Sequence, residues 1–113
     1  MIEKVILDYM HSRGFRAYME IPKDTPSHLY PFLVIEKTGA SRQNRITTST
    51  LAFQSYAESL YEAAAFNEQV KAAVEDSVMC REITRAAFQN DYNFTDTTTK
   101  RYRYQAVYDI SHY

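Results

Sequence analysis

Histidine and cysteine are the side chains that most often bind metals or act as bases and nucleophiles. The chain of 113 residues contains three histidines, His11, His28 and His112, and one cysteine, Cys80. No two of these four residues are three or four positions apart, so a helix would not bring a pair of them to one face as a metal site requires. We therefore expect the histidines to occupy surface or loop positions and predict no metal site.

The remaining nucleophile and acid candidates also lack a catalytic setting. A hydrolytic serine usually stands on a tight turn between glycines, and no serine of this chain does. Cys80 precedes Arg81, whose charge would lower the pKa of the thiol, but one cationic neighbour is little support for a nucleophile. The carboxylates are expected on a solvated helix face or beside a turn, where Asp bonds to local backbone: Glu58, Glu62 and Glu75 on the helix, and Asp91 and Asp96 at the turn. We predict no catalytic residue and no enzyme.

Composition excludes further classes. The two glycines, Gly14 and Gly39, are 25 positions apart. The chain therefore contains neither a Walker A loop nor a dinucleotide-binding fingerprint, both of which need clustered glycines, and we predict no cofactor. Lys and Arg number 13 against 14 Asp and Glu, with a formal charge of -1, which disfavours general nucleic-acid binding. The single cysteine excludes an intrachain disulfide and favours a reducing compartment.

Two stretches remain that could bind a partner. The segment Ser41–Arg45 contains Arg42 and Arg45 on a polar hairpin tip; it is either a solvated turn or a contact with carboxylates or phosphates of a partner. The C-terminal stretch 102–113 is rich in tyrosine, and its candidate residues are Tyr102, Tyr104 and Tyr108. Tyrosine is common in sheets and in protein interfaces, and it also stacks on bases, so core, interface and nucleic-acid roles stay open.

The first half of the chain is expected to form a helix followed by three strands. Apolar residues at helical spacing predict a helix over residues 2–12, stopped by Gly14. Alternation then predicts a strand from Phe15 to Ile21, ended by Pro22, and residues 23–31 are a predicted loop. Residues 32–38 and 45–55 are predicted strands of a hairpin with a five- or six-residue loop.

The second half is expected to contain one long helix and two strands. Ser55 and Glu58 form a capping box, which predicts a helix from about Tyr56 to Asp76. Residues 83–94 and 101–110 are predicted strands on either side of a turn at 95–99. In the last strand one face is shared by alternate residues: Tyr102, Tyr104, Ala106, Tyr108 and Ile110.

These elements predict one domain over residues 1–113, of class α+β and order α-β-β-β-α-β-β, with one mostly antiparallel or mixed sheet and helices packed against it. The short apolar stretch at the N-terminus is broken by Asp8 and His11, and no apolar run approaches the roughly 18 residues that span a bilayer. We expect a cytoplasmic protein without membrane or export signals.

In the order, spacing and composition of several segments, the chain resembles the small tail-completion proteins of tailed bacteriophages and prophages. These are the tail-terminator, head–tail joining or minor capsid proteins. The similar segments are Ile21–Pro22, "PFLVIEKTGAS" at 31–41, "QSYAESLYEAAAFNEQVKAAV" at 54–74 and "YNFTD" with "RYRYQAVYDI" within 92–110. The resemblance covers residues 2–112 and departs where Ala40 follows Gly39, at a position where the family often has a second glycine.

This resemblance implies a structural protein without cofactor. It would be a virion component, assembled in the cytoplasm of the bacterial host, that forms a ring, typically hexameric, at the end of the tail tube. Its partners would be further copies of itself, the tail-tube protein and the head-connector proteins, with no membrane and no specific nucleic acid. Two alternatives stay open: a monomeric peptide- or protein-binding adaptor that uses the Tyr-rich strand, and a small enzyme dependent on Cys80.

Overall fold

The sheet of this protein has five strands in the order β1-β2-β3-β5-β4, as seen in a computed structural model that describes residues 1–23, 25–99 and 101–113. The short β1 (Ala17–Tyr18) lies parallel to β2 (Phe32–Gln43), and all other neighbours are antiparallel. The long strands are β3 (Ile46–Ala57), β4 (Ile83–Asn93) and β5 (Tyr102–His112). The predicted α+β class, element order and mixed sheet are confirmed.

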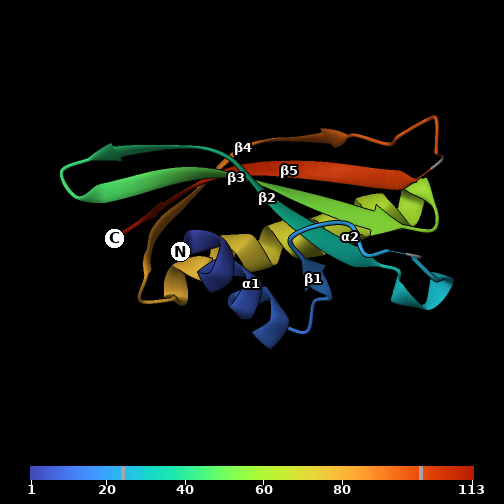
Figure 1. Cartoon of the computed structure of the whole chain (residues 1–113), viewed down its shortest axis with the longest axis horizontal. Coiled ribbons are helices and arrows are strands. Elements are labelled where there is room, and N and C mark those ends of the chain that lie inside the picture. Colours follow the sequence, from blue (N-terminus) through green and yellow to red (C-terminus); the bar gives the residue numbers. More distant parts are fainter. Residues whose placement is uncertain (24, 100) are drawn as a thin grey trace.

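Two α-helices cover one face of this sheet (Figure 1). Helix α1 (Ile2–Ser12) buries Ile2, Ile6 and Met10, as its apolar spacing predicts. It ends before Gly14, whose φ of +88° suits glycine. Helix α2 (Leu60–Glu75) runs along the sheet and continues into a 3₁₀ turn, Asp76–Met79.

The main core lies between these helices and the sheet. Its buried members are Ile2, Ile6, Met10, Ala17, Leu33, Ile35, Leu51, Phe53, Phe66, Val70, Ala73, Val74, Ile83, Ala106, Tyr108 and Ile110. Since side chains alternate along a strand, a second small cluster of Phe32, Val34 and Tyr56 lies on the opposite face. A 3₁₀ turn, Ser27–Leu29, lies next to this cluster and contributes Leu29 to it.

The start of α2 differs from the prediction. Ser59, not Ser55, is the N-cap, and its hydroxyl accepts a hydrogen bond from the backbone N–H of Glu62 at 3.1 Å. Ser55 instead continues β3 opposite Tyr104 of β5. The chain contains two successive Ser-x-x-Glu patterns, and strand pairing takes the first one into the sheet, so the second one begins the helix.

The predicted hairpin is confirmed, but its five- or six-residue loop is wrong. Strand β2 extends to Gln43, and a two-residue turn of Asn44 and Arg45 joins it to β3. Both turn residues have positive φ, 51° and 68°, as in the type I′ turns whose twist matches paired strands. Polar residues 39–43 therefore belong to a strand, since cross-strand pairing outweighs their weak strand propensity.

The predicted strand from Phe15 to Ile21 shrinks to Ala17–Tyr18, because only these residues pair with β2. The 3₁₀ turn interrupts the predicted loop 23–31, in which Asp24 lies outside the described residues. The last two strands agree with the predicted 83–94 and 101–110 to within two residues. In β5, Tyr102, Tyr104 and Tyr108 share the face that points to the helices, as the alternation predicts.

Candidate functional site

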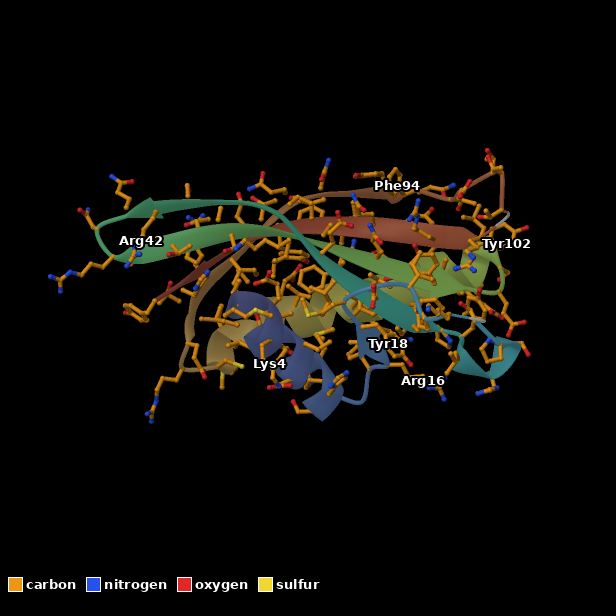
Figure 2. The ribbon with its side chains drawn as sticks, viewed as in Figure 1. Lys4, Arg16, Tyr18, Arg42, Phe94 and Tyr102 are labelled. Atoms are coloured by element: carbon orange, nitrogen blue, oxygen red, sulfur yellow. The ribbon has the colours of Figure 1, made fainter. Side chains whose placement is uncertain are left out.

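The hairpin of β2 and β3 ends in an arm, residues 39–50, at one extremity of a molecule measuring 43 × 25 × 23 Å. Figure 2 places Arg42 on this arm and Tyr102 at the opposite end of the long axis. Arg42 and Arg45 are both exposed, and among the described residues neither takes part in an ion pair. The arm thus presents two guanidinium groups to a partner.

Arg45 occupies a conformation that is unfavourable for its residue type. A non-glycine residue with a left-handed backbone is strained because its Cβ approaches the following carbonyl, and only Gly, Asn and Asp adopt it readily. Asn44, the first turn residue, belongs to that group, whereas Arg45 at φ 68° does not. Strain of this kind at a charged tip points to a function of the side chain rather than of the fold.

The three tyrosines of the predicted interface have different environments. Tyr102 is 37% exposed and Tyr104 is half-buried, whereas Tyr108 is fully buried. The Tyr108 hydroxyl donates a hydrogen bond to the Glu75 carboxylate at 2.6 Å. Tyr108 is therefore a core residue that connects β5 to α2, which corrects its placement among the interface candidates.

A charged cluster beside Tyr108 connects α2 to β4. The Asp91 carboxylate accepts hydrogen bonds from Lys71 Nζ at 2.8 Å and from the Asn67 amide at 2.9 Å. Hydrogen bonds to Asp91 and to Glu68 raise the pKa of Lys71, while burial and the Glu75 carboxylate raise the pKa of Tyr108. Glu68 pairs with Lys71 within α2, but the bonds of Asp91 and of Tyr108 join α2 to two strands, so the cluster stabilises the helix on the sheet.

Ser49 and His112 form a contact that the sequence does not reveal. The Ser49 hydroxyl lies 3.0 Å from His112 Nε2, the distance of a nucleophile and its base. Ser49 is fully buried in the middle of β3, however, and His112 Nδ1 faces only the Tyr113 carbonyl at 3.3 Å. A substrate carbonyl could not reach the hydroxyl, so this pair does not form a hydrolytic site.

Cys80, the remaining nucleophile candidate, shows no activating contact among the described residues. It follows α2 in a half-buried position, and burial and then the Glu82 carboxylate raise the pKa of its thiol, opposite to the effect expected from Arg81. A raised pKa disfavours the thiolate form that acts as a nucleophile. Within the described ranges no three His, Cys, Asp or Glu residues gather as a metal site would need.

An aromatic row crosses the face of the sheet that the helices leave free, at the end opposite the arm, where Leu29 and Tyr30 pack against it. Phe32 of β2 stacks on Tyr56 of β3 with ring centroids 4.9 Å apart. The Arg103 guanidinium of β5 lies 4.3 Å from the Phe94 ring centroid and donates a hydrogen bond to the Tyr56 hydroxyl at 2.8 Å. These contacts hold the Arg103 side chain between β3 and the residue that follows β4, so its role is to stabilise the sheet.

Two hollows lie on the helix side of the molecule. One, of about 630 Å³, is lined by residues of α1 and by the segment after β1. The other, of about 390 Å³, lies along the first half of α2. Its lining consists of Pro31, Tyr61, Glu62, Ala65, Phe66 and Gln69.

Comparison with known proteins adds no family: no protein-family model matches the chain, and no curated protein matches it. Among the described helices, none is long and apolar enough to cross a bilayer. The arm with Arg42 and Arg45, and the groove on α2, are thus the features that suit a binding partner best.

Proposed function

We propose that this protein is a structural subunit of a tailed phage or prophage virion. In this proposal, copies of the chain assemble in the host cytoplasm into a ring of about six, which terminates the tail tube or joins the tail to the head. Its partners are other copies, the tail-tube protein and the head-connector proteins. The observation that carries the proposal is the whole-chain resemblance to tail-completion proteins, over an α+β order that the structure also has.

The shape of the molecule supports assembly into a ring. A ring requires heterologous contacts, in which one surface of a subunit meets a different surface of the next. The arm forms one end of the long axis, and the start of α2 lies at the other (Figure 1). The two ends present different side chains: the arm carries Arg42 and Arg45, whereas the start of α2 carries Glu58 and Glu62 and lies beside Arg101 and Arg103 at the start of β5.

The monomeric adaptor has less support. A peptide added to β5 would need a free strand edge, but β5 is paired with β3 on one side and with β4 on the other. Tyr108, which such an adaptor would use, is buried. Among the described strands, the edges open to strand addition are those of β4, of the two-residue β1 and of the part of β2 beyond its pairing with β1.

Light scattering after size-exclusion chromatography, over a wide range of protein concentration, tests this function. We expect oligomers whose population rises with concentration, and closed rings of about six subunits in negative-stain images. Binding of the chain to tail tubes that lack their terminal protein is the second readout. A chain that stays monomeric at high concentration and does not bind such tubes would contradict the proposal.

A further inference from the structure

The groove along the first half of α2 combines an apolar floor with one carboxylate, that of Glu62, in its lining. Ala65 and Phe66 line it together with Tyr61, which is 82% exposed. Glu62 also lines the groove, and Glu58 precedes the helix by two residues; both carboxylates are exposed. Neither has an ion-pair partner among the residues that the structure describes.

The arm carries the complementary set of side chains. Arg42 and Arg45 supply two free guanidinium groups, and Ile46 beside them is an apolar side chain that is 37% exposed. Guanidinium groups pair with carboxylates and also stack on aromatic rings such as that of Tyr61. Strain at Arg45 is explained if its side chain is held at the tip for such a contact.

An arm cannot occupy the groove of its own chain. The 12 residues of β3 separate the tip from the start of α2, and at about 3.3 Å per residue they span about 40 Å. Figure 1 shows the arm and the start of α2 at opposite ends of the sheet. The occupant that this geometry allows is the arm of a second copy.

The larger hollow beside β1 is a poorer acceptor for the arm. Its charged and titratable lining includes Lys23 and His11 as well as Glu20. Lys23 would repel the guanidinium groups, whereas no basic side chain lines the groove on α2. Charge therefore selects the α2 groove.

We propose that the arm of one copy docks in the α2 groove of the next, with Arg42 and Arg45 on Glu58 and Glu62 and with Ile46 against the apolar floor. The contact is heterologous, so it propagates from copy to copy and closes where the rotation divides a full turn. This inference rests on the proposed function, because it names the surfaces through which the subunits of the ring would join.

Charge reversal and its rescue test the contact. The variants are the arm double Arg42→Glu with Arg45→Glu, the groove double Glu58→Lys with Glu62→Lys, and the fourfold combination. A matched control, Arg81→Glu with Arg85→Glu, changes the net charge of the chain by the same amount as the arm double does, at two exposed positions elsewhere. Tyr61→Ala is a further groove variant whose side chain is too exposed to matter for folding. Thermal unfolding of every variant confirms that it is folded.

The association constant from sedimentation velocity is the readout. We expect each double variant to weaken self-association at least tenfold, the fourfold variant to recover it to within about threefold, and the control to leave it unchanged. In an equimolar mixture of the two double variants, the intact arm of one meets the intact groove of the other, and the reversed arm meets the reversed groove. We expect that mixture to associate as the fourfold variant does, with the two chains alternating.

The outcomes separate the contact from the proposed function. If the wild type associates into tube-binding rings and the arm variant does so equally, the inference is overturned while the proposed function stands. If reversal and rescue behave as expected but no closed ring forms and no tail tube is bound, the contact stands and the proposed function fails. A wild type that never self-associates overturns the contact as well.

Discussion

On the face of the sheet that α1 and α2 cover, Leu51 and Phe53 are fully buried, whereas the next residue of the same strand, Gln54, points to the opposite face. The covered face is apolar and is stabilised by removal of hydrocarbon from water. On the uncovered face the side chains are mostly polar and bond to one another across strands. Gln54 donates to Gln105 at 2.9 Å, and Thr50 donates to Asp109 at 2.7 Å.

This difference indicates where the molecule can bind a partner. A face whose polar groups are already paired gains little from being covered, because a partner would have to replace bonds that exist. It also needs no cover, because its exposed atoms are compatible with water. The two ends of the molecule, the arm and the α2 groove, keep charged groups without partners among the described residues, so contacts between copies are expected at the ends.

The largest effect should come from neighbouring residues on opposite faces of β3. Phe53→Ala removes a buried ring that packs edge-on against Tyr108, and we expect the free energy of unfolding to fall by about 3–5 kcal/mol. Gln54→Ala, its matched control, removes the hydrogen bond to Gln105 and the longer one, at 3.5 Å, to Glu36 on the opposite face, and should cost about 1 kcal/mol. Urea denaturation measures both. Equal losses would show that the two faces contribute alike.

The second prediction concerns Asp91, the charged residue that β4 directs toward α2. Asp91→Ala removes the acceptor of the Asn67 amide, and Asn67 is 1% exposed with an amide oxygen that already lacks a partner. Leaving this amide without any hydrogen bond should lower the free energy of unfolding by about 2 kcal/mol. The loss is limited because Lys71 keeps its ion pair with Glu68. Asp91→Asn retains an acceptor and serves as the control. If both variants lose the same stability in urea denaturation, the charge is what matters.

The third prediction is a loss of stability at alkaline pH. The pKa values of Tyr108 and Lys71 are both raised in the folded chain, so the unfolded chain releases these protons first as the pH rises. Their contribution to the free energy of unfolding is complete below the ordinary pKa values, about 10. Above them it falls by about 1.4 kcal/mol per pH unit for each group, until the pH reaches the raised pKa of that group.

Urea denaturation between pH 8 and pH 11 measures this slope. The raised pKa values of Cys80 and Tyr9 add to the same slope. Tyr108→Phe removes one of these groups and should reduce the slope above pH 10, whereas Tyr113→Phe, at an 80% exposed position, should leave it unchanged. An identical slope in both variants would exclude Tyr108 as its source.

The sequence predicts the local features of the fold well. Helical spacing locates α1, and alternation assigns one face of β5 to Tyr102, Tyr104 and Tyr108. The start of α2 is not predictable in this way, because Ser55 and Ser59 both begin a Ser-x-x-Glu pattern and only the pairing of β3 with β5 selects between them.

The same limit applies to the candidate site. Arg42 and Arg45 are recognisable from sequence because both belong to the polar segment Ser41–Arg45, and the structure places both at the exposed tip. The burial of Tyr108 depends on which side of the sheet α2 covers, and the contact of Ser49 with His112 joins positions 63 residues apart. Neither is encoded in local spacing, so contacts between distant strands decide them.

The smallest effect should be a gain in stability at the turn of the arm. Arg45→Gly relieves a left-handed backbone, and we expect the free energy of unfolding to rise by about 1 kcal/mol. Asn44→Gly at φ 51° is the control and should change it by only a few tenths of a kcal/mol, since asparagine tolerates this conformation.

The same Arg45→Gly variant should lose self-association, because it removes one guanidinium group from the arm. A more stable chain that associates more weakly would mean that Arg45 is retained for the contact at a cost to the fold. A chain with greater stability and unchanged association would assign the contact to Arg42 and Ile46 alone. No gain in stability would show that neighbouring contacts compensate for the strain at the turn.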